Sequence, residues 1–596
     1  MFARILLRLL MISPLTLRRL ESNTCLIANP SRQTMIEDVM NAREAIVTKT
    51  GALAAWFPST DTGRIPKDTY IVQHGSSIET VDWSSPNAHP MTAETFDWLF
   101  DQALEILSAK RKLYVLDRSV GAHEQYALSL KLITDSPLTS LFADTMFRPA
   151  LSWFDSAHHD NVWKQKQQKH VTPNPSSLRT GSVEGRHAFP KNFRKESKSA
   201  FADHPFTLLA LPSDPIETEE FAGELRVENG KTVPRIVAMD MERRMGIVQG
   251  TKYLGAVKKT LFTVMNHLLP DHGVLPLHCS AVMDDHGETH LFLGLSGTGK
   301  TTLSTAANLS LIGDDEHLWS SDGIANIENG CYAKLIRLSK EKEPQIYEAV
   351  FGSRSNVTNG VIIENTMVYP NGSIDLDDTR LTENSRAAFP LSFLENTVPS
   401  ATGSHPQTIL FLTADAEGVL PPISKLTLNQ ALLWYLMGYT SKLAGTETGV
   451  TEPQTNFSRF FGAPFMLRRP HDYLNLFRKF ITAHGSDIYL VNTGWAGGPY
   501  GIGKRMDITL TRSLVTSALT GALENVPYRE DRRFHLFVPE SCPGIDPMLL
   551  NPERQWGNRY AYAKRADALA AKFAATFEKN FAGTVAEEIA RECPGL

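Results

Sequence analysis

The pattern of apolar and polar positions along the chain predicts an α/β protein. Residues 95–107 carry apolar side chains at helical spacing, whereas the apolar run 113–117 is typical of a buried strand. A second such strand, 289–293, leads into a glycine-rich turn and a helical stretch at 301–307. Beyond Leu275, short apolar strands alternate with helices and glycine turns. We therefore expect an α/β N-terminal domain followed by a second α/β domain.

The end of the chain has the pattern of an amphipathic helix. Residues 565–592 are rich in alanine, and four apolar side chains recur at every fourth position, at Leu569, Phe573, Phe577 and Phe581. This spacing lines one face of a helix. We predict a single closing helix whose aromatic stripe packs into the core rather than forming a binding site.

Size and composition limit the classes of protein to which the chain can belong. A chain of 596 residues exceeds the size at which one core stops growing, so we expect two or three domains. The net charge of −5 shows no global basic excess, which argues against bulk nucleic-acid binding. The five cysteines form no CxxC pair, which favours a reducing compartment with neither a disulfide framework nor a cysteine zinc site.

A basic segment interrupts the first half of the chain. Residues 161–200 contain nine lysines and arginines but only two acidic residues, together with many prolines, serines and asparagines. We interpret the surrounding region, about 155–203, as a flexible insertion. A solvated surface loop is favoured over an anion or nucleic-acid patch, because few aromatic residues interleave with the charges.

The first 20 residues contain four arginines and no acidic residue. This composition fits an organellar transit peptide, but also a start-site artefact or a frayed terminal helix. The segment, taken as 1–30, is too short and too interrupted by arginine to span a membrane. We expect a cytoplasmic protein, with a mitochondrial location as the alternative.

The most informative motif is Gly294-Leu-Ser-Gly-Thr-Gly-Lys-Thr-Thr302, between the predicted strand and helix. Its glycines allow phosphate oxygens to approach backbone amides, and the following helix N-terminus adds positive potential. Lys300 can reach the β and γ phosphates, and the Thr301 hydroxyl can bind Mg²⁺. The predicted nucleotide-binding residues of this loop are Gly294, Leu295, Ser296, Gly297, Thr298, Gly299, Lys300, Thr301 and Thr302.

Two acidic residues follow the next predicted strand, in Leu309-Ser-Leu-Ile-Gly-Asp-Asp-Glu-His317. In phosphate-loop proteins, a carboxylate at this place binds the metal ion that bridges the β and γ phosphates. Asp314 and Asp315 are therefore candidates, one as a direct ligand and one through water. A merely structural Gly-Asp-Asp turn is the alternative interpretation.

Five sequence blocks, in order, give the chain a resemblance to the ATP-dependent phosphoenolpyruvate carboxykinase family. The resemblance runs from about Thr62 to the C-terminus. The blocks begin at Leu293, Gly313, Gly330, Lys442 and Tyr489, and include Lys-Leu-Ala-Gly-Thr-Glu at 442–447. The resemblance implies the reversible conversion of oxaloacetate and ATP to phosphoenolpyruvate, CO₂ and ADP.

This family resemblance also implies an architecture. We expect an N-terminal substrate-side domain at 31–273 and a nucleotide-binding domain with a phosphate loop at 274–596. The active site would lie in the cleft between them, with a mobile lid at about 442–456. The implied partners are small molecules, with neither nucleic acid nor membrane among them, and the sequence leaves open whether the chain forms a homo-oligomer.

The resemblance assigns roles to individual residues. Lys259, His278 and Asp315 would hold Mn²⁺, and Thr301 would hold Mg²⁺. Arg386 matches the arginine at the transferring phosphoryl group, where a planar, permanently charged guanidinium suits the spreading charge. The remaining implied residues are Lys258 beside the metal, Tyr253 facing the substrate or CO₂, and the nucleotide contacts Lys334, Glu343, Arg505, Met506 and Thr511.

Arg64 lies in a segment, 61–68, that resembles the substrate-carboxylate loop of this family. Arginine is suited to bidentate capture of a carboxylate. The chain departs from the family pattern here, with Ile65 where a serine is expected. This departure and the basic insertion leave open an impaired ATP-binding regulatory homologue. The phosphate loop leaves open a second alternative, a related phosphate-loop protein-serine kinase.

Overall fold

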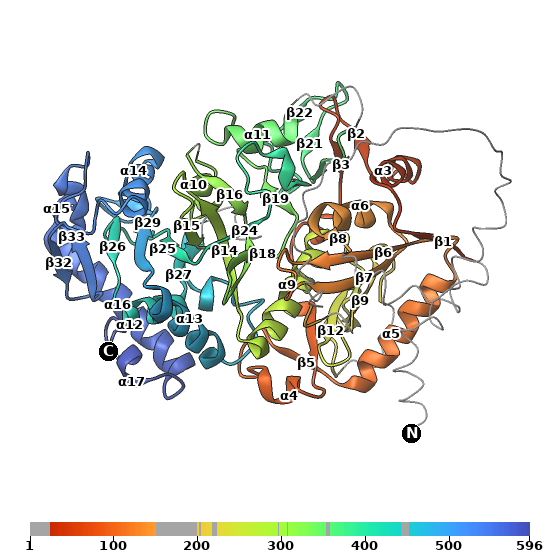
Figure 1. The fold of residues 1–596 in the computed structure, drawn as a ribbon, viewed down its shortest axis with the longest axis horizontal. Helices are drawn as coiled ribbons and strands as arrows, with labels where there is room; N and C mark the ends of the chain where they lie inside the picture. Colours follow the sequence, from red (N-terminus) through yellow and green to blue (C-terminus); the bar gives the residue numbers. More distant parts are fainter. Residues whose placement is uncertain are drawn as a thin grey trace, which may run out of the picture.

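A computed structural model describes residues 24–150, 199–201, 204–216, 223–295, 297–306, 308–352, 358–442 and 452–596. The chain forms a mixed α/β protein with two large sheets that lie side by side (Figure 1). Most of the predicted terminal segment, of the basic insertion and of the lid lies outside the described residues, but Cys25–Ala28, within the predicted segment 1–30, form a strand of the first sheet. Among the described residues, no helix combines the length and apolar character needed to cross a membrane.

The first large sheet is mixed, with parallel and antiparallel pairs. Along its main path the strands are β1 (Cys25–Ala28), β6 (Lys112–Val120), β7 (Leu128–Thr134), β9 (Phe206–Leu211), β13 (Met245–Gln249), β12 (Ile236–Asp240), β4 (Thr69–Val72) and β5 (His89–Met91), and β8 (Arg148–Pro149) pairs with β6. The predicted strand at 113–117 is confirmed within β6.

Helices cover both faces of this sheet. One face packs against α5 (Ala93–Ser108), which confirms the helix predicted at 95–107. Thr92 caps it by accepting a hydrogen bond from the Thr95 amide, and Phe96 and Leu99 on its buried side enter the core. The other face packs against α3 (Arg32–Asn41), α6 (Pro137–Met146) and α9 (Gly255–Leu268).

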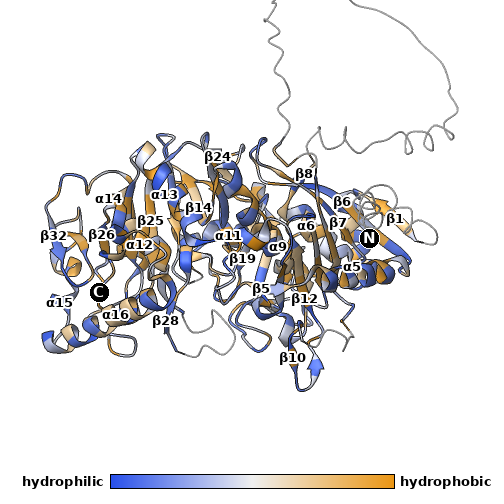
Figure 2. Ribbon diagram, turned by 90° about the horizontal axis from the view of Figure 1, so that it is seen from below, coloured by the Kyte–Doolittle hydropathy of each residue, from blue (hydrophilic) through white to orange (hydrophobic). Residues whose placement is uncertain are grey.

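The second large sheet contains the glycine-rich turn. Its strands run in the order β24 (Thr402–Gly403), β18 (Gly323–Asn326), β17 (Glu316–Ser320), β14 (Leu275–Met283), β15 (Thr289–Leu293), β25 (Pro406–Thr413), β29 (Asp487–Asn492), β26 (Ile423–Lys425), β33 (Leu536–Pro539) and β32 (Tyr528–Asp531), and β16 (Ser310–Gly313) pairs with β14. The predicted strand at 289–293 coincides with β15. Apolar residues concentrate on the strands and on the inner faces of the helices (Figure 2).

Helices also flank this second sheet on two sides. One core cluster contains residues of α12 (Leu428–Met437), α13 (Pro470–His484) and α16 (Arg559–Phe581). The other contains residues of α10 (Lys300–Ser304), α11 (Pro344–Phe351) and α14 (Ile508–Leu519). The described residues also form three short helices: α4 (Ser77–Thr80), α15 (Pro552–Gln555) and α17 (Glu587–Ala590).

A third sheet joins segments from both halves of the chain. Its strands are β19 (Gly330–Lys334), β23 (Arg386–Pro390), β20 (Ile362–Glu364), β3 (Leu53–Ala55) and β2 (Ile46–Val47). Strand β3 pairs in parallel with β20, so residues near position 54 lie beside residues near position 363. This sheet brings Arg386 into register with both Lys334 and Glu364.

The prediction of one closing helix over 565–592 was wrong. Helix α16 ends at Phe581, and Gly583 then adopts a φ of 71° before α17 begins. A positive φ is open to glycine but ends a right-handed helix. The predicted packing is confirmed, because Leu569, Phe573, Phe577 and Phe581 are all buried.

Small two-stranded ribbons form outside the three larger sheets. They are β10 (Val227–Glu228) with β11 (Lys231–Thr232), β21 (Met367–Val368) with β22 (Ile374–Asp375), β27 (Tyr439–Lys442) with β28 (Gln454–Phe457), and β30 (Trp495–Ala496) with β31 (Lys504–Arg505). Ribbon β27–β28 flanks the predicted lid: Lys442 pairs with Gln454, and residues 443–451 between them are outside the described part.

Candidate active site

The glycine-rich turn connects β15 to α10. Gly297 and Gly299 have φ values of 86° and 95°, which L side chains rarely adopt, so glycine is needed at both positions. Gly294 is also constrained, since a Cβ there would lie 2.5 Å from Thr298 Oγ1. Helix α10 begins at Lys300 and ends at Ser304, shorter than the predicted stretch 301–307. Ser296 lies outside the described residues.

Neighbouring segments hold the turn in shape. Thr298 donates its hydroxyl hydrogen to Leu295 O at 2.8 Å. Thr493, which follows β29, donates to Thr298 O at 2.9 Å, and Arg505 Nη2 donates to Gly297 O at 2.8 Å. Sequence segments separated by about two hundred residues therefore fix the backbone of this loop.

Asp315 is the centre of a cluster of charged side chains. Its Oδ1 lies 2.6 Å from Lys300 Nζ and 3.2 Å from His278 Nε2, and its Oδ2 lies 2.7 Å from Lys259 Nζ and 3.0 Å from Lys258 Nζ. Burial opposes ionisation of this carboxyl, but the three ammonium groups hold its pKa well below the usual range. Asp315 is therefore a carboxylate at neutral pH.

Two further carboxyl groups complete the cluster. Glu328 Oε1 lies 2.7 Å from Lys258 Nζ, and Glu316 Oε1 lies 2.9 Å from Lys259 Nζ. Although burial disfavours its charge, Asp315, Glu328 and Glu316 raise the pKa of Lys258 well above its usual value. Lys258 is 2% exposed, so its ammonium charge is stabilised by these acids rather than by water.

The orientation of His278 is fixed by a backbone carbonyl. His278 Nδ1 lies 2.7 Å from Phe461 O, so this nitrogen carries the hydrogen and donates it. The Nε2 lone pair then faces Asp315. Burial, with Lys300 nearby, lowers the pKa of His278 to about 3, so the ring is neutral at pH 7.

The donor set around Asp315 suits a divalent metal ion. A neutral imidazole nitrogen, a carboxylate and the Lys259 amine converge, and mixed nitrogen and oxygen ligands suit Mn²⁺. The imidazole donates its other ring hydrogen to a backbone carbonyl, as metal-binding histidines usually do, and this bond orients the ring. Lys259 can serve as a ligand only as the neutral amine.

Asp314 belongs to the phosphate-loop side of the site. It follows β16 directly and is 8% exposed. Burial and the charge of Asp315 raise its pKa, while a hydrogen bond from the Thr301 side chain works in the opposite direction. The hydroxyl and the carboxyl predicted to serve the nucleotide metal are thus in contact.

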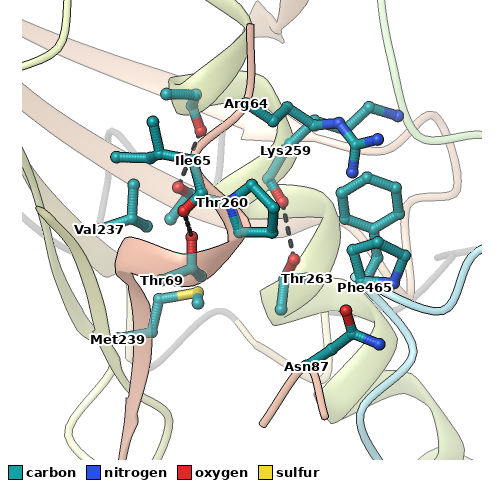
Figure 3. Close-up of a pocket in the computed structure, with 13 residues that line it drawn as sticks. Arg64, Ile65, Thr69, Asn87, Val237, Met239, Lys259, Thr260, Thr263 and Phe465 are labelled. Atoms are coloured by element: carbon teal, nitrogen blue, oxygen red, sulfur yellow. Dashed lines mark hydrogen bonds between the residues drawn. The ribbon is translucent and has the colours of Figure 1, made fainter. Parts of the chain in front are cut away.

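Arg64 and Lys259 share an aromatic neighbour. The Arg64 guanidinium lies 4.9 Å from the Phe465 ring centre, and Lys259 Nζ lies 4.7 Å from the same centre (Figure 3). Both residues line a small pocket of about 40 Å³. Ile65 lines it too but is only 5% exposed and belongs to the apolar core, and its carbonyl accepts a hydrogen bond from Thr69.

Buried hydrogen bonds link Leu254 to Arg386 through Glu364 and Tyr332, beside the Tyr253 ring. Glu364 Oε1 accepts the Leu254 amide hydrogen at 3.2 Å, and its Oε2 accepts the Tyr332 hydroxyl hydrogen. The Tyr332 ring lies 6.1 Å from the Tyr253 ring and 5.6 Å from the Arg386 guanidinium, which also donates to Tyr332 O at 3.3 Å. Burial raises the pKa of Glu364 to about 7.

The predicted nucleotide contacts differ in where the structure places them. Thr302 donates to Glu343 Oε1 at 2.6 Å, which places Glu343 against the phosphate loop. Burial and the charge of Arg386 lower the pKa of Lys334 to about 8. Arg505 and Met506 line a second pocket of about 390 Å³, whereas Thr511 is buried on α14 and donates to Asp507 O rather than lining that pocket.

Five side chains at the site carried no sequence-based assignment. Glu316 and Tyr332 stand in the sequence blocks that begin at Gly313 and Gly330, so their positions could have indicated the site. The other three come from segments without a recognised motif, and only folding brings them to the site: Glu328, Glu364 and Phe465.

Comparison with known proteins identifies the family. The family model for phosphoenolpyruvate carboxykinase of the ATP type matches residues 24–183 and 187–548. The phosphoenolpyruvate carboxykinase (ATP) of Geobacillus kaustophilus is 42% identical over 546 residues, which cover 91% of this chain and 92% of the relative. The proteins of the same name from Thermus thermophilus and Bacillus subtilis are 40% and 39% identical over 89% and 92% of this chain, and over 90% and 93% of their own lengths. The chain therefore belongs to the ATP-dependent phosphoenolpyruvate carboxykinase family.

Proposed function

We propose that the protein catalyses the reversible conversion of oxaloacetate and ATP to phosphoenolpyruvate, ADP and CO₂, a lyase reaction of gluconeogenic or anaplerotic metabolism. Family membership supports this activity. The observation that carries it is the sharing of one carboxylate, Asp315, by the phosphate-loop residue Lys300 and by Lys259 and His278. We infer from this sharing that an enolate-stabilising site adjoins a phosphoryl-transfer site.

The proposed active site lies in the cleft between an N-terminal substrate-side domain and the nucleotide-binding domain. Arg64 and the α9 lysines, Lys258 and Lys259, approach from the first side. The β15–α10 turn and Asp315, which follows β16, approach from the second. The contacts of Asp315 with both α9 and the phosphate loop support this location.

Two divalent ions fit the donor sets, Mn²⁺ at Lys259, His278 and Asp315, and Mg²⁺ at Thr301 with Asp314 nearby. When bound, such ions supply fixed positive charge to the enolate and to the phosphate oxygens. The protein's contribution is to preorient the ligands: Phe461 O fixes the His278 ring, and the surrounding ammonium groups keep Asp315 ionised.

On the substrate side, we assign three residues to binding and charge stabilisation. Arg64 binds a substrate carboxylate, and the Phe465 ring holds its guanidinium in place. Tyr253, which is 6% exposed, contacts the substrate or CO₂. Lys258 stays charged beside the metal ligands and stabilises the developing enolate oxygen.

On the nucleotide side, Lys300 exchanges Asp315 for the β and γ phosphates when ATP binds. Arg386 stabilises the charge that spreads over the transferring phosphoryl group. Lys334 and Glu343 contact the nucleotide close to the phosphate loop, and the base occupies the pocket lined by Arg505 and Met506. Thr511 reaches the base only after its hydroxyl leaves Asp507 O.

The reaction is tested in the carboxylation direction. Purified protein with Mn²⁺, ADP, bicarbonate and phosphoenolpyruvate should form oxaloacetate, which malate dehydrogenase couples to oxidation of NADH. Lys300→Ala is the matched control, because it removes the phosphate-binding ammonium group. A rate no higher than that of the Lys300→Ala variant would refute the proposed activity.

A further inference from the structure

A group of potential metal ligands lies outside the proposed active site, at the turn between β14 and β15. Each of Asp284, Glu288 and His290 offers one ligand atom, and these three atoms all lie within 4.8 Å of one another. Asp284 follows the end of β14, and His290 is the second residue of β15. We propose that these three residues form a binding site for one Zn²⁺ ion.

The strongest support comes from His290. Its side chain is completely buried, and neither ring nitrogen has a hydrogen-bond partner among the described residues. Its Nε2 faces Asp284 Oδ2 at 3.4 Å, too long for a good hydrogen bond. A buried imidazole with no hydrogen bond calls for another partner, because unsatisfied buried polar groups are costly.

The distance between the two atoms fits a shared ion. Zinc binds histidine nitrogen and carboxylate oxygen at about 2.1 Å, and tetrahedral geometry then separates any two ligand atoms by about 3.4 Å. His290 Nε2 and Asp284 Oδ2 have this separation.

The turn fixes the carboxylate of Asp284 for this role. Asp284 Oδ1 accepts backbone hydrogen bonds from His286 and Glu288, both at 2.9 Å. These two bonds occupy one carboxylate oxygen and direct the other toward His290. Glu288 is exposed at the rim, so an ion can enter from solvent, and a water molecule can complete four-coordination.

The site is connected to the phosphate loop by a single strand. β15 starts at Thr289, beside the proposed site, and ends at Leu293, directly before Gly294. Its position within the sheet is further set by pairing with β14 and β25. A bound ion would fix the start of the strand that carries the loop, and we assign it a structural role.

Metal content of the full-length protein tests the proposal. The protein is stripped with a chelator, dialysed against Zn²⁺ and analysed by mass spectrometry for zinc bound per chain. Asp284→Asn preserves an oxygen acceptor for the turn but removes the charge, and Glu288→Gln does the same at the rim. Both variants should bind one zinc ion fewer than the wild type. Asp285→Asn, an exposed neighbour outside the group, should bind as many as the wild type.

A second comparison separates this ion from any ion at Asp315. His278→Ala alters only the proposed active site, so it should keep the ion that depends on Asp284. Co²⁺ should also give the visible absorption of a tetrahedral complex in the wild type and in His278→Ala, and lose it in Asp284→Asn. Equal zinc content in the wild type and in a folded Asp284→Asn variant would overturn the proposal and leave Asp284 and His290 as an ordinary ion pair.

Discussion

Lys300 Nζ lies 2.6 Å from Asp315 Oδ1, so the lysine of the glycine-rich turn is paired with a carboxylate of the adjoining charged cluster. The same carboxylate contacts Lys259 and His278. Asp315 therefore keeps positive groups together before any nucleotide arrives. If Lys300 binds the nucleotide as proposed, phosphate oxygens replace this carboxylate, and nucleotide binding is coupled to the ligands of the proposed Mn²⁺ site.

Removal of the Asp315 charge should therefore inactivate the enzyme. Asp315→Asn leaves Lys258, Lys259 and Lys300 without their common counter-ion and removes a metal ligand. We expect kcat to fall by roughly 10²–10³-fold or more. Melting temperature should drop as well, because a buried charge cluster loses one partner. Asp322→Asn, at an exposed aspartate, is the control, and a kcat for Asp315→Asn within twofold of it would contradict the assignment.

Glu364 should act as a positioning residue for Arg386. Its carboxyl group holds the Leu254 amide and the Tyr332 hydroxyl, and Tyr332 contacts Arg386. We expect Glu364→Gln to lower kcat by about tenfold, since one buried hydrogen bond is worth about 1–3 kcal/mol, with little change in the KM for nucleotide.

A double-mutant cycle distinguishes this role from a general loss of stability. Tyr332→Phe should reduce kcat to a similar extent, and the double variant should be little worse than either single variant, because both substitutions break one chain of contacts. Fully additive losses in the cycle would show that Glu364 and Tyr332 act separately.

The value of kcat/KM for ADP should fall above about pH 8. Burial and Arg386 lower the pKa of Lys334 to about 8, so its ammonium charge is lost as the pH rises through this value. If Lys334 binds phosphate, kcat/KM for ADP should then approach a decrease of about tenfold per pH unit. Lys334→Arg keeps its charge and should give a flat profile in this range. The same decrease in both proteins would assign the titration to another group.

Acid should destabilise the fold through a buried histidine. His267 is 3% exposed, and burial with the charge of Arg468 lowers its pKa to about 4. The unfolded chain binds a proton at about pH 6.5, so this contribution to stability is present above that value and is lost as the pH falls toward 4. Its limiting slope is about 1.4 kcal/mol per pH unit.

Denaturation midpoints at pH 7, 6 and 5 test this contribution. His267→Gln cannot take up the proton, so its midpoint should fall less steeply with acid than that of the wild type. Parallel midpoints for the two proteins would mean that the other buried histidines account for acid sensitivity, and His317, with a pKa lowered to about 3, would be the next to test.

Local patterns in the sequence were sufficient to predict helices and strands whose apolar residues recur at a regular spacing. The strand at 289–293 and the helix containing 95–107 were predicted because their apolar spacing is unambiguous. The break at Gly583 was missed because the alanine-rich pattern continues on both sides of it. The backbone conformation of a single residue can end a helix, and amino-acid composition does not reveal that conformation.

At the site, motifs led to the residues that lie close together along the chain. The phosphate loop and Asp315 could be recognised from spacing, whereas Glu328 and Glu364 could not. These two glutamates stand on different segments of the chain and meet Lys258 and Leu254 only through tertiary packing. The family resemblance supplied roles for single residues, and the contacts among them came from the fold.

Product stoichiometry tests the central claim most directly, that one site couples decarboxylation to phosphoryl transfer. The protein is incubated with oxaloacetate, ATP, Mn²⁺ and Mg²⁺, and phosphoenolpyruvate, CO₂ and ADP are measured in the same samples. We predict equal amounts of phosphoenolpyruvate and ADP, an equal amount of CO₂ once the spontaneous decarboxylation of oxaloacetate in a protein-free sample is subtracted, and the loss of this enzymatic yield in Lys300→Ala. Formation of ADP without phosphoenolpyruvate, or phosphoenolpyruvate formation that survives in Lys300→Ala, would contradict the account.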